Sequence, residues 1–128
     1  MAITSAICSS FKQELLQGKH NFSSSSGDSF KIALFDSSAT LGASTTDYST
    51  SEEITNTSGT AYTAGGKALT NTGVGLTSTT AFTDFSDVSW TTASFTANGA
   101  LIYNTTTGTD TSTTDAVCAI AFGSDKTA

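Results

Sequence analysis

The stretch DVSWTTASFTANGALIYN (residues 87–104) decides the fold that we expect for this chain. It holds two dense β-forming runs, WTTASFTA and ALIYN, which are joined by Asn98 and Gly99. A two-residue type I′ turn requires positive φ at both central positions, and Asn and Gly tolerate this conformation. The stretch therefore predicts a β-hairpin that turns at Asn98 and Gly99.

The composition predicts a mainly β, single domain over residues 1–128. Eight Phe, three Tyr and one Trp supply large apolar side chains, and the chain contains no Pro. Thr favours strands and Ser favours loops, and both are abundant. Short strands separated by Gly and Ser/Thr turns predict an antiparallel β-sandwich or a partly open barrel over residues 28–122.

One helix is expected over residues 5–17. Thr4 or Ser5 is placed to cap its N-terminus, because a hydroxyl accepts hydrogen bonds from unpaired backbone N–H groups. Gly18 lies where a glycine commonly ends a helix. The apolar stripe of this helix comprises Ile7, Cys8, Phe11 and Leu15. Two interpretations of the stripe stay open: it closes the core of the sheet, or it docks on a partner chain.

Two further strands are expected in the first two thirds of the chain. The run FKIALFD (residues 30–36) predicts a strand in which Phe30, Ile32 and Leu34 share one face. The run TAFTDFSDVSW (residues 80–90) predicts a strand with a bend near Ser86. Between the two runs, AYTAGGKALTN (residues 61–71) predicts a hairpin about its paired glycines.

The end of the chain predicts a buried strand and a turn. AVCAIAF (residues 116–122) is the strand, and GSDK (residues 123–126) is the turn. A further strand is expected after such a turn, so either the fold leaves an edge that a partner covers or the full gene product is longer. Ser/Thr-rich loops are expected over residues 36–60, as an elaborated surface loop or short edge strands, and over residues 104–115.

The acidic charge argues against two classes of partner. The formal net charge is −6, and nucleic-acid binding requires a basic surface. The same charge disfavours an anionic membrane surface. Glu52 and Glu53 are expected as a surface pair. The N-terminus lacks the features of a secretory signal, and no apolar run approaches ~18 residues, so synthesis in the cytoplasm is expected.

No group of residues matches a catalytic or metal-binding pattern. His20 is the single histidine, and no GxSxG-like motif is present. Cys8 and Cys118 are expected as free buried thiols, with a disulfide as the alternative, and with one His they do not make a structural zinc site. Asp110 and Asp115 offer oxygen ligands to Ca²⁺, but the EF-hand spacing is missing.

Two other sets of side chains have a structural and a functional interpretation. Asp84 and Asp87 form a carboxylate pair of the type that hydrolyses glycosides, but their position favours solvent-facing carboxylates at a strand end. Trp90, Phe95 and Tyr103 suit a carbohydrate-stacking platform, but aromatic residues alternating along strands favour the core. We therefore expect no enzyme activity, cofactor or metal.

Six segments, spread over nearly the whole chain, carry a family resemblance: MAITSAICSSFKQELLQGKHNF (1–22), FKIALFDSSATLGASTTDYST (30–50), YTAGGKALTN (62–71), TAFTDFSDVSW (80–90), ANGALIYN (97–104) and FGSDKT (122–127). In this order they resemble a family of small virion structural proteins of tailed bacteriophages, including marine and cyanobacterial phages. Family members often have a basic residue in place of Asn98, and they continue past FGSDKT into another strand pair. These segments specify strands and turns and carry no catalytic residue.

The resemblance implies a non-enzymatic component of the virion, on the capsid exterior. The expected role is a decoration or cement protein that binds the major capsid protein lattice. A homo-oligomer is expected, and a trimer suits local three-fold positions of a shell. The alternatives are a tail, fibre or knob component that contacts the host surface, and a glycan hydrolase. The candidate structural or interaction residues are Phe11, Trp90, Asn98, Gly99 and Tyr103.

Overall fold

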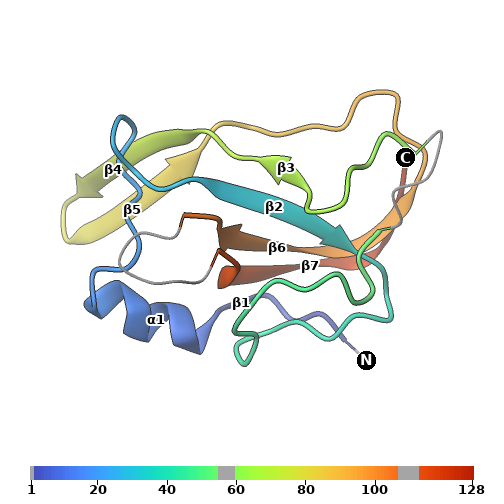
Figure 1. The fold of residues 1–128 in the computed structure, drawn as a ribbon, viewed down its shortest axis with the longest axis horizontal. Coiled ribbons are helices and arrows are strands. Elements are labelled where there is room, and N and C mark those ends of the chain that lie inside the picture. The colour runs from blue at the N-terminus through green and yellow to red at the C-terminus, as the bar shows by residue number, and fades with distance from the viewer. Residues whose placement is uncertain (1, 55–59, 107–112) are drawn as a thin grey trace.

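The computed structural model describes residues 2–54, 60–106 and 113–128. Its elements, in chain order, are β1 (Ala6–Ile7), α1 (Ser9–Leu16), β2 (Phe30–Phe35), β3 (Lys67–Ala68), β4 (Asn71–Thr77), β5 (Thr80–Phe85), β6 (Thr96–Asn104) and β7 (Asp115–Thr127). Five strands form one sheet in the order β1-β7-β6-β2-β3, and β4 and β5 form a second, two-stranded sheet (Figure 1). The predicted fold class is confirmed: the chain is mainly β, with two antiparallel sheets in a sandwich-like arrangement and one short N-terminal helix.

The five-stranded sheet buries side chains on both faces. Ala33 and Phe35 of β2 pack into one cluster, with α1 and the segment around Phe22. Ile32 and Leu34 pack into the other cluster, together with Tyr62, Trp90 and Phe95 from the loops. Strand alternation explains this division. The predicted strand is confirmed, but Phe30 joins the first cluster, where its ring stacks on Phe22 at 4.5 Å between centroids.

The predicted hairpin at Asn98 and Gly99 is wrong. β6 runs through both residues, and Gly99 pairs with Phe35 on one side and Ala121 on the other. Most of WTTASFTA (residues 90–97) lies in a loop, and only its last two residues, from Thr96, belong to the strand. A central strand buried on both sides outweighs the local turn preference of Asn-Gly, since a turn here would expose the β6 core residues.

Close packing explains why a glycine stands at position 99. A Cβ there would lie 2.7 Å from the carbonyl oxygen of Ile120 and 2.7 Å from the side chain of Ile3. Glycine is therefore required here because neighbouring chain segments approach closely, and not because the backbone adopts a positive φ. The pairing of β6 with β7 is irregular between Ala97 and Gly99, and Asn98 donates a side-chain hydrogen bond of 2.9 Å to Asp125.

The last strand is longer than predicted. β7 continues through residues 123–126, where a turn was expected, and it pairs with the start of β6 through Lys126 and Thr127. Gly123 has φ +83 and lies in the irregular part of this pairing. The turn-like composition therefore marks a distortion within one strand and not its end.

β4 and β5 form a hairpin that the sequence did not predict. Its two-residue turn is Ser78 and Thr79, between the paired residues Thr77 and Thr80. Ser78 has φ +54, the sign that a type II′ turn requires at its first central position. Sequence reasoning placed a hairpin at residues 61–71 instead. That segment has a turn at Ala64 and Gly65, closed by a hydrogen bond from the N–H of Gly66 to the carbonyl of Thr63, but residues 60–63 before the turn do not form a strand.

The helix is shorter than predicted. α1 begins at Ser9, because Ala6 and Ile7 pair with β7 as the short strand β1. Cys8 is the N-cap residue and makes no side-chain capping bond, so capping by Thr4 or Ser5 is wrong. The C-terminal prediction is confirmed: Gly18 has φ +74, and the N–H of Lys19 donates to the carbonyl of Glu14. Among the described residues, no helix is long and apolar enough to span a membrane.

The long loop over residues 36–54 is held to the rest of the chain by backbone bridges. Its bridges join Leu41 to Ile3, Asp47 to Asp115, and Glu53 to Phe35. Of the two predicted alternatives, the described part is a loop with isolated bridges and contains no edge strand. The remainder of the predicted loops includes residues 55–59 and 107–112, which lie outside the described residues.

Candidate functional site

α1 and the β4–β5 hairpin, which we call the arm, lie at the same end of the molecule (Figure 1). Side chains of both elements line an apolar groove. The groove is open to solvent and has a volume of about 750 Å³. Its apolar lining includes Ile7, Phe11 and Leu15 on the helix side, and Val74, Phe82 and Phe85 on the arm. We call this feature the α1–arm groove.

The surface around the groove exposes large apolar side chains. Leu16 of α1 is 91% exposed, and Leu76 and Val74 of the arm are 71% and 63% exposed. Ile7, Leu15 and Phe82 are each about half exposed. Single exposed leucines are normal on a soluble protein, but four such side chains lining one groove (Ile7, Leu15, Val74 and Phe82), with Leu16 and Leu76 exposed on the same helix and hairpin, are typical of a surface that binds another molecule.

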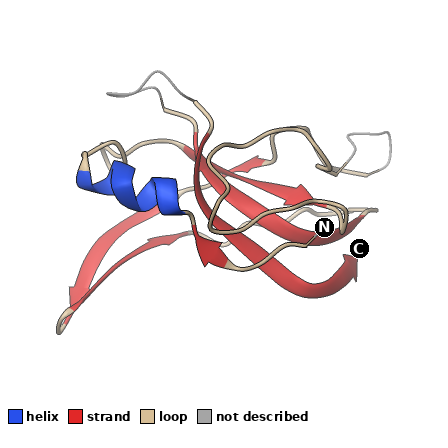
Figure 2. Cartoon of the chain, turned by 90° about the horizontal axis from the view of Figure 1, so that it is seen from below, coloured by secondary structure: helices blue, strands red, loops and turns tan. Residues whose placement is uncertain are grey.

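The arm stands apart from the rest of the fold (Figure 2). β4 and β5 pair only with each other in the part of the chain that the structure describes. At its base, Asn71 donates side-chain hydrogen bonds to the carbonyls of Ser23 and Asp28, and Phe85 packs on Phe22 and Phe30. The base is therefore anchored to the core, whereas the far end presents its side chains to solvent.

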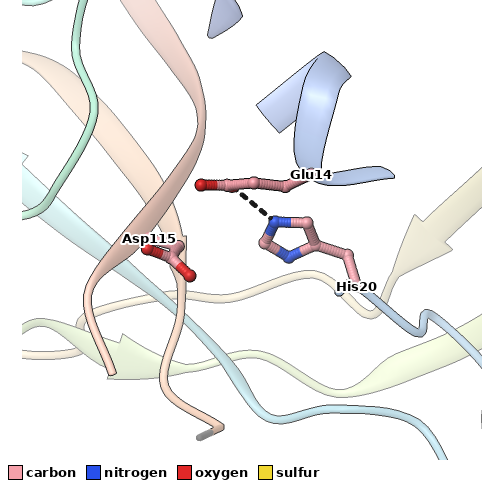
Figure 3. Close-up of side chains that lie close together, drawn as sticks. All are labelled: Glu14, His20 and Asp115. Carbon is pink, nitrogen blue, oxygen red and sulfur yellow. Dashed lines mark hydrogen bonds and ion pairs between the residues drawn. The ribbon is translucent and has the colours of Figure 1, made fainter. Parts of the chain in front are cut away.

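A polar network lies beneath the groove, at the C-terminal end of α1 (Figure 3). His20 is buried, and its Nε2 lies 2.9 Å from Oε1 of Glu14. Its Nδ1 lies 2.9 Å from Nδ2 of Asn104, which also donates a 2.8 Å hydrogen bond to Asp28. The network thus joins α1, the segment after it and the end of β6.

The orientation of Asn104 determines which nitrogen of His20 carries the proton. The Asn104 side-chain oxygen accepts the N–H of Thr106, so its NH₂ group faces the imidazole ring. Nδ1 of His20 must then accept, and Nε2 carries the proton and donates it to Glu14. Every polar atom of the Asn104 and His20 side chains has a partner in this arrangement.

The same residues are the best candidate for a metal centre. Glu14, His20 and Asp115 each offer one ligand atom, and these atoms lie within 4.8 Å of one another. A metal bound at Nε2 would move the ring proton to Nδ1, which faces the donor group of Asn104. The hydrogen-bond network therefore opposes a metal at this place, and the cluster fits a structural role better. Asp110, the other residue considered for calcium, lies outside the described residues.

Glu53 is the centre of a second hydrogen-bond network. The sequence suggested a surface residue at this position, and that expectation is wrong. Its carboxylate accepts hydrogen bonds of 2.6 Å from the hydroxyls of Tyr48 and Tyr62 and one of 2.8 Å from the N–H of Gly65. Tyr62 also accepts the N–H of Leu34 in β2. These contacts fasten two loops to the sheet. Glu52, its neighbour, is exposed, as expected.

The candidate aromatic residues lie in different parts of the core and form no common platform. Tyr103 is buried and stacks on Tyr48, with 4.4 Å between ring centroids. Trp90 and Phe95 pack around Tyr62 on the other face of the sheet. The core interpretation of these three residues is therefore confirmed. The helix stripe is divided: Cys8 and Phe11 are buried in the core, whereas Ile7 and Leu15 are about half exposed, so the core interpretation holds for only part of the stripe.

The two cysteines are free thiols, as expected. Burial, and to a smaller extent Glu14, raises the pKa of the Cys8 thiol. Burial and the nearby Cys8 raise the pKa of Cys118 to about 11. A raised pKa keeps a thiol protonated at neutral pH, and a protonated thiol is a poor nucleophile.

Asp84 and Asp87 are exposed, as the sequence indicated. Asp84 lies on β5 and accepts the N–H of Phe85, and Asp87 follows the end of the strand. A glycosidase requires one carboxyl group in an environment that keeps it protonated. Exposed positions do not supply that environment.

The strand predicted at residues 80–90 contains β5, but sequence reasoning missed its partner β4, the arm that the two form, and the histidine network. β4 was hidden because glycines at positions 73 and 75 lower its strand propensity. The network joins residues that are far apart in the chain, and a single sequence carries no signal for that contact.

Comparisons with protein-family models, curated proteins and solved structures found no match.

Proposed function

We propose that this protein is a non-enzymatic structural subunit of a bacteriophage virion, a capsid decoration protein that binds the major capsid protein. The observation that carries the proposal is the apolar surface formed by the α1–arm groove and the exposed residues of α1. The resemblance of the sequence to virion structural proteins indicates the virion as the assembly to which this subunit would belong. The apolar surface supplies the means of attachment.

Burial of this surface would provide the binding energy. Apolar area removed from water contributes about 25 cal/mol per Å², and several large side chains here are half or more exposed. A shell presents many equivalent sites, so modest binding at each one is enough to stabilise the particle. A decoration protein needs no reactive group for this role.

The chemistry of the described residues supports a non-enzymatic role. The one histidine is fixed in a hydrogen-bond network, and both thiols have a raised pKa. The carboxylates considered for glycoside hydrolysis, Asp84 and Asp87, are exposed. None of these groups has the environment of an activated nucleophile or a general acid.

A second candidate is a tail or fibre component that binds host glycans. The observation that favours it is an open cavity of about 510 Å³ in the loop over residues 36–54. Serine and threonine residues provide much of its lining, and Asp47 and Glu52 add carboxylates. Hydroxyl and carboxylate groups suit the hydrogen bonding of sugars, but the described lining has no exposed aromatic ring on which a sugar would stack.

A cryo-EM reconstruction of the particle that carries this chain tests the proposal. We expect density that repeats across the capsid and bridges shell subunits, with the α1–arm groove at the contact. Density confined to the tail would contradict a decoration role and favour the second candidate. Absence of the chain from purified particles would contradict both.

A binding experiment tests which surface makes the contact. Leu16→Ala removes the most exposed apolar side chain of α1, so we expect weaker binding to particles that lack the protein. Lys126→Ala, near the end of β7, is the control and is expected to bind as the wild type does. Equal binding of both variants would exclude α1 from the contact.

A further inference from the structure

We propose that two copies of this chain associate through the outer edge of β5, about a two-fold axis at Phe82. The two arms would form one four-stranded antiparallel sheet. The inference does not depend on the proposed virion role. It rests on the edge, the faces and the charge of the arm.

Around Phe82, the outer edge of β5 lacks the features that normally prevent strands from pairing. Proteins protect exposed strand edges with charged side chains, Pro, bulges or covering segments. β5 has neither Lys nor Pro, and both its one charged residue, Asp84, and the one pairing irregularity of the arm, between Asn71 and Gly73, lie at its base. Residues 80–84 are all exposed, so no described segment covers this strand.

Hydrogen-bond alternation defines which residues would pair. Thr77 and Thr80 close a two-residue turn, and such a closing pair exchanges its hydrogen bonds within the hairpin. Phe82, two residues further along, then bonds inward to Gly75 in β4. The backbone groups of Ala81 and Thr83 point outward and are available to a second strand.

A two-fold axis at Phe82 satisfies this pattern. Ala81 of one copy would exchange hydrogen bonds with Thr83 of the other, and the two Phe82 residues would lie opposite each other as a non-hydrogen-bonded pair. Side chains approach most closely in pairs of that kind, and aromatic cross-strand pairs are favourable. Phe82 is 49% exposed, and its ring contacts no other aromatic ring in the described part of the chain.

The charge distribution favours a second copy as the partner. The chain carries a net charge of −6, so two copies repel each other over most of their surfaces. Residues 68–83 contain no charged side chain, and Asp84 is the one charged residue of the arm, so the arm is a place where two copies can meet with little repulsion. An edge strand is also complementary to itself in the antiparallel orientation, so one chain supplies both halves of the contact.

Cysteine cross-linking tests the register of this contact. In Phe82→Cys the two introduced residues would face each other at about 4.5 Å between Cα atoms, within the range of a disulfide. We expect a covalent dimer after mild oxidation. Leu76→Cys is the matched control: it lies on β4, one strand further from the axis in each copy, and we expect it to remain uncross-linked.

Sedimentation equilibrium tests the association itself. We expect the wild-type protein to form dimers, Phe82→Thr to raise the dissociation constant at least tenfold, and Val74→Thr, on the other strand, to leave it unchanged. Thermal melting of the monomeric variant shows whether the arm remains folded. A wild-type monomer at all accessible concentrations would overturn the proposal, as would a dimer that is insensitive to Phe82→Thr. A monomer that still binds capsids would leave the proposed function standing and identify the β5 edge as a candidate contact with the shell.

Discussion

Gly99 combines the properties of a turn residue with a position inside a strand. Its neighbours are the carbonyl of Ile120 and the side chain of Ile3, both 2.7 Å from where a Cβ would stand. The requirement for glycine here comes from packing in three dimensions. The sequence shows the glycine but not that Ile120 and Ile3 lie against it in the fold. The pair Asn98 and Gly99 therefore led to the wrong prediction of a turn.

We expect Gly99→Ala to destabilise the protein by roughly 1–3 kcal/mol, because the added methyl group overpacks a position with no free space. Urea unfolding measures the change. Gly42→Ala is the control, since a Cβ there would make ordinary contacts of 3.8 Å with Thr4. Equal stability of the two variants would show that the neighbours of Gly99 can move apart.

Glu53 is the second residue whose environment the sequence did not reveal. We expect Glu53→Gln to reduce the free energy of unfolding by about 1.5–3 kcal/mol, because it weakens charge-assisted hydrogen bonds from Tyr48, Tyr62 and Gly65. Glu52→Gln makes the same chemical change at an exposed neighbour and is expected to lie within about 0.5 kcal/mol of the wild type. Similar losses in both variants would contradict the role of Glu53.

At the scale of elements, long apolar runs were predicted well. FKIAL, ALIYN and AVCAIAF lie in β2, β6 and β7, because strands buried on both faces need continuous apolar sequence. The ends of elements were predicted less well. α1 begins later than predicted, because residues 6 and 7 form the strand β1. Backbone pairing of these residues with β7 takes the place of the expected hydroxyl cap.

α1 docks through Phe11, whose ring packs on His20 at 4.8 Å and on Phe22 at 5.9 Å between centroids. We expect Phe11→Ala to cost roughly 3–5 kcal/mol of stability by leaving a cavity. Leu16→Ala, on the same helix but 91% exposed, should cost no more than about 0.5 kcal/mol. Chemical denaturation of the two variants makes the comparison, and a small effect of Phe11→Ala would mean that α1 contributes little to the core.

At the scale of the whole molecule, the fold class was predictable and the strand order was not. Composition and strand spacing indicate an antiparallel β protein with one helix. The pairing of β1 with β7 and of β2 with β6 joins segments separated by tens of residues, and one sequence gives no information about such partners. The groove and the histidine network depend on those pairings, which is why neither was foreseen.

All three tyrosines of the chain link the stability of the whole fold to alkaline pH. Burial is the main cause that raises the pKa of Tyr48, Tyr62 and Tyr103, and Tyr103 is raised to about 12. An unfolded tyrosine ionises near pH 10, so between these values the unfolded chain binds fewer protons than the folded one. The contribution of Tyr103 to stability is therefore complete below about pH 10 and is lost as the pH rises through 12.

Phenolate absorbance and circular dichroism, followed together in an alkaline titration, measure this effect. We expect the tyrosines to ionise as the sheet unfolds, above the pH at which they ionise in a denatured control. Ionisation near pH 10 with the sheet intact would contradict the burial of the hydroxyls.

The position of β7 between β1 and β6 affects how a ribosome can produce this protein. Residues 6–16 are synthesised well before residues 115–121, which form the part of β7 on which they pair and pack. Such a chain has a high contact order, which is typical of slow folding. Until then the apolar side chains of α1 and β2 have no sheet to cover them, so we expect nascent chains to depend on chaperones until the last strand inserts.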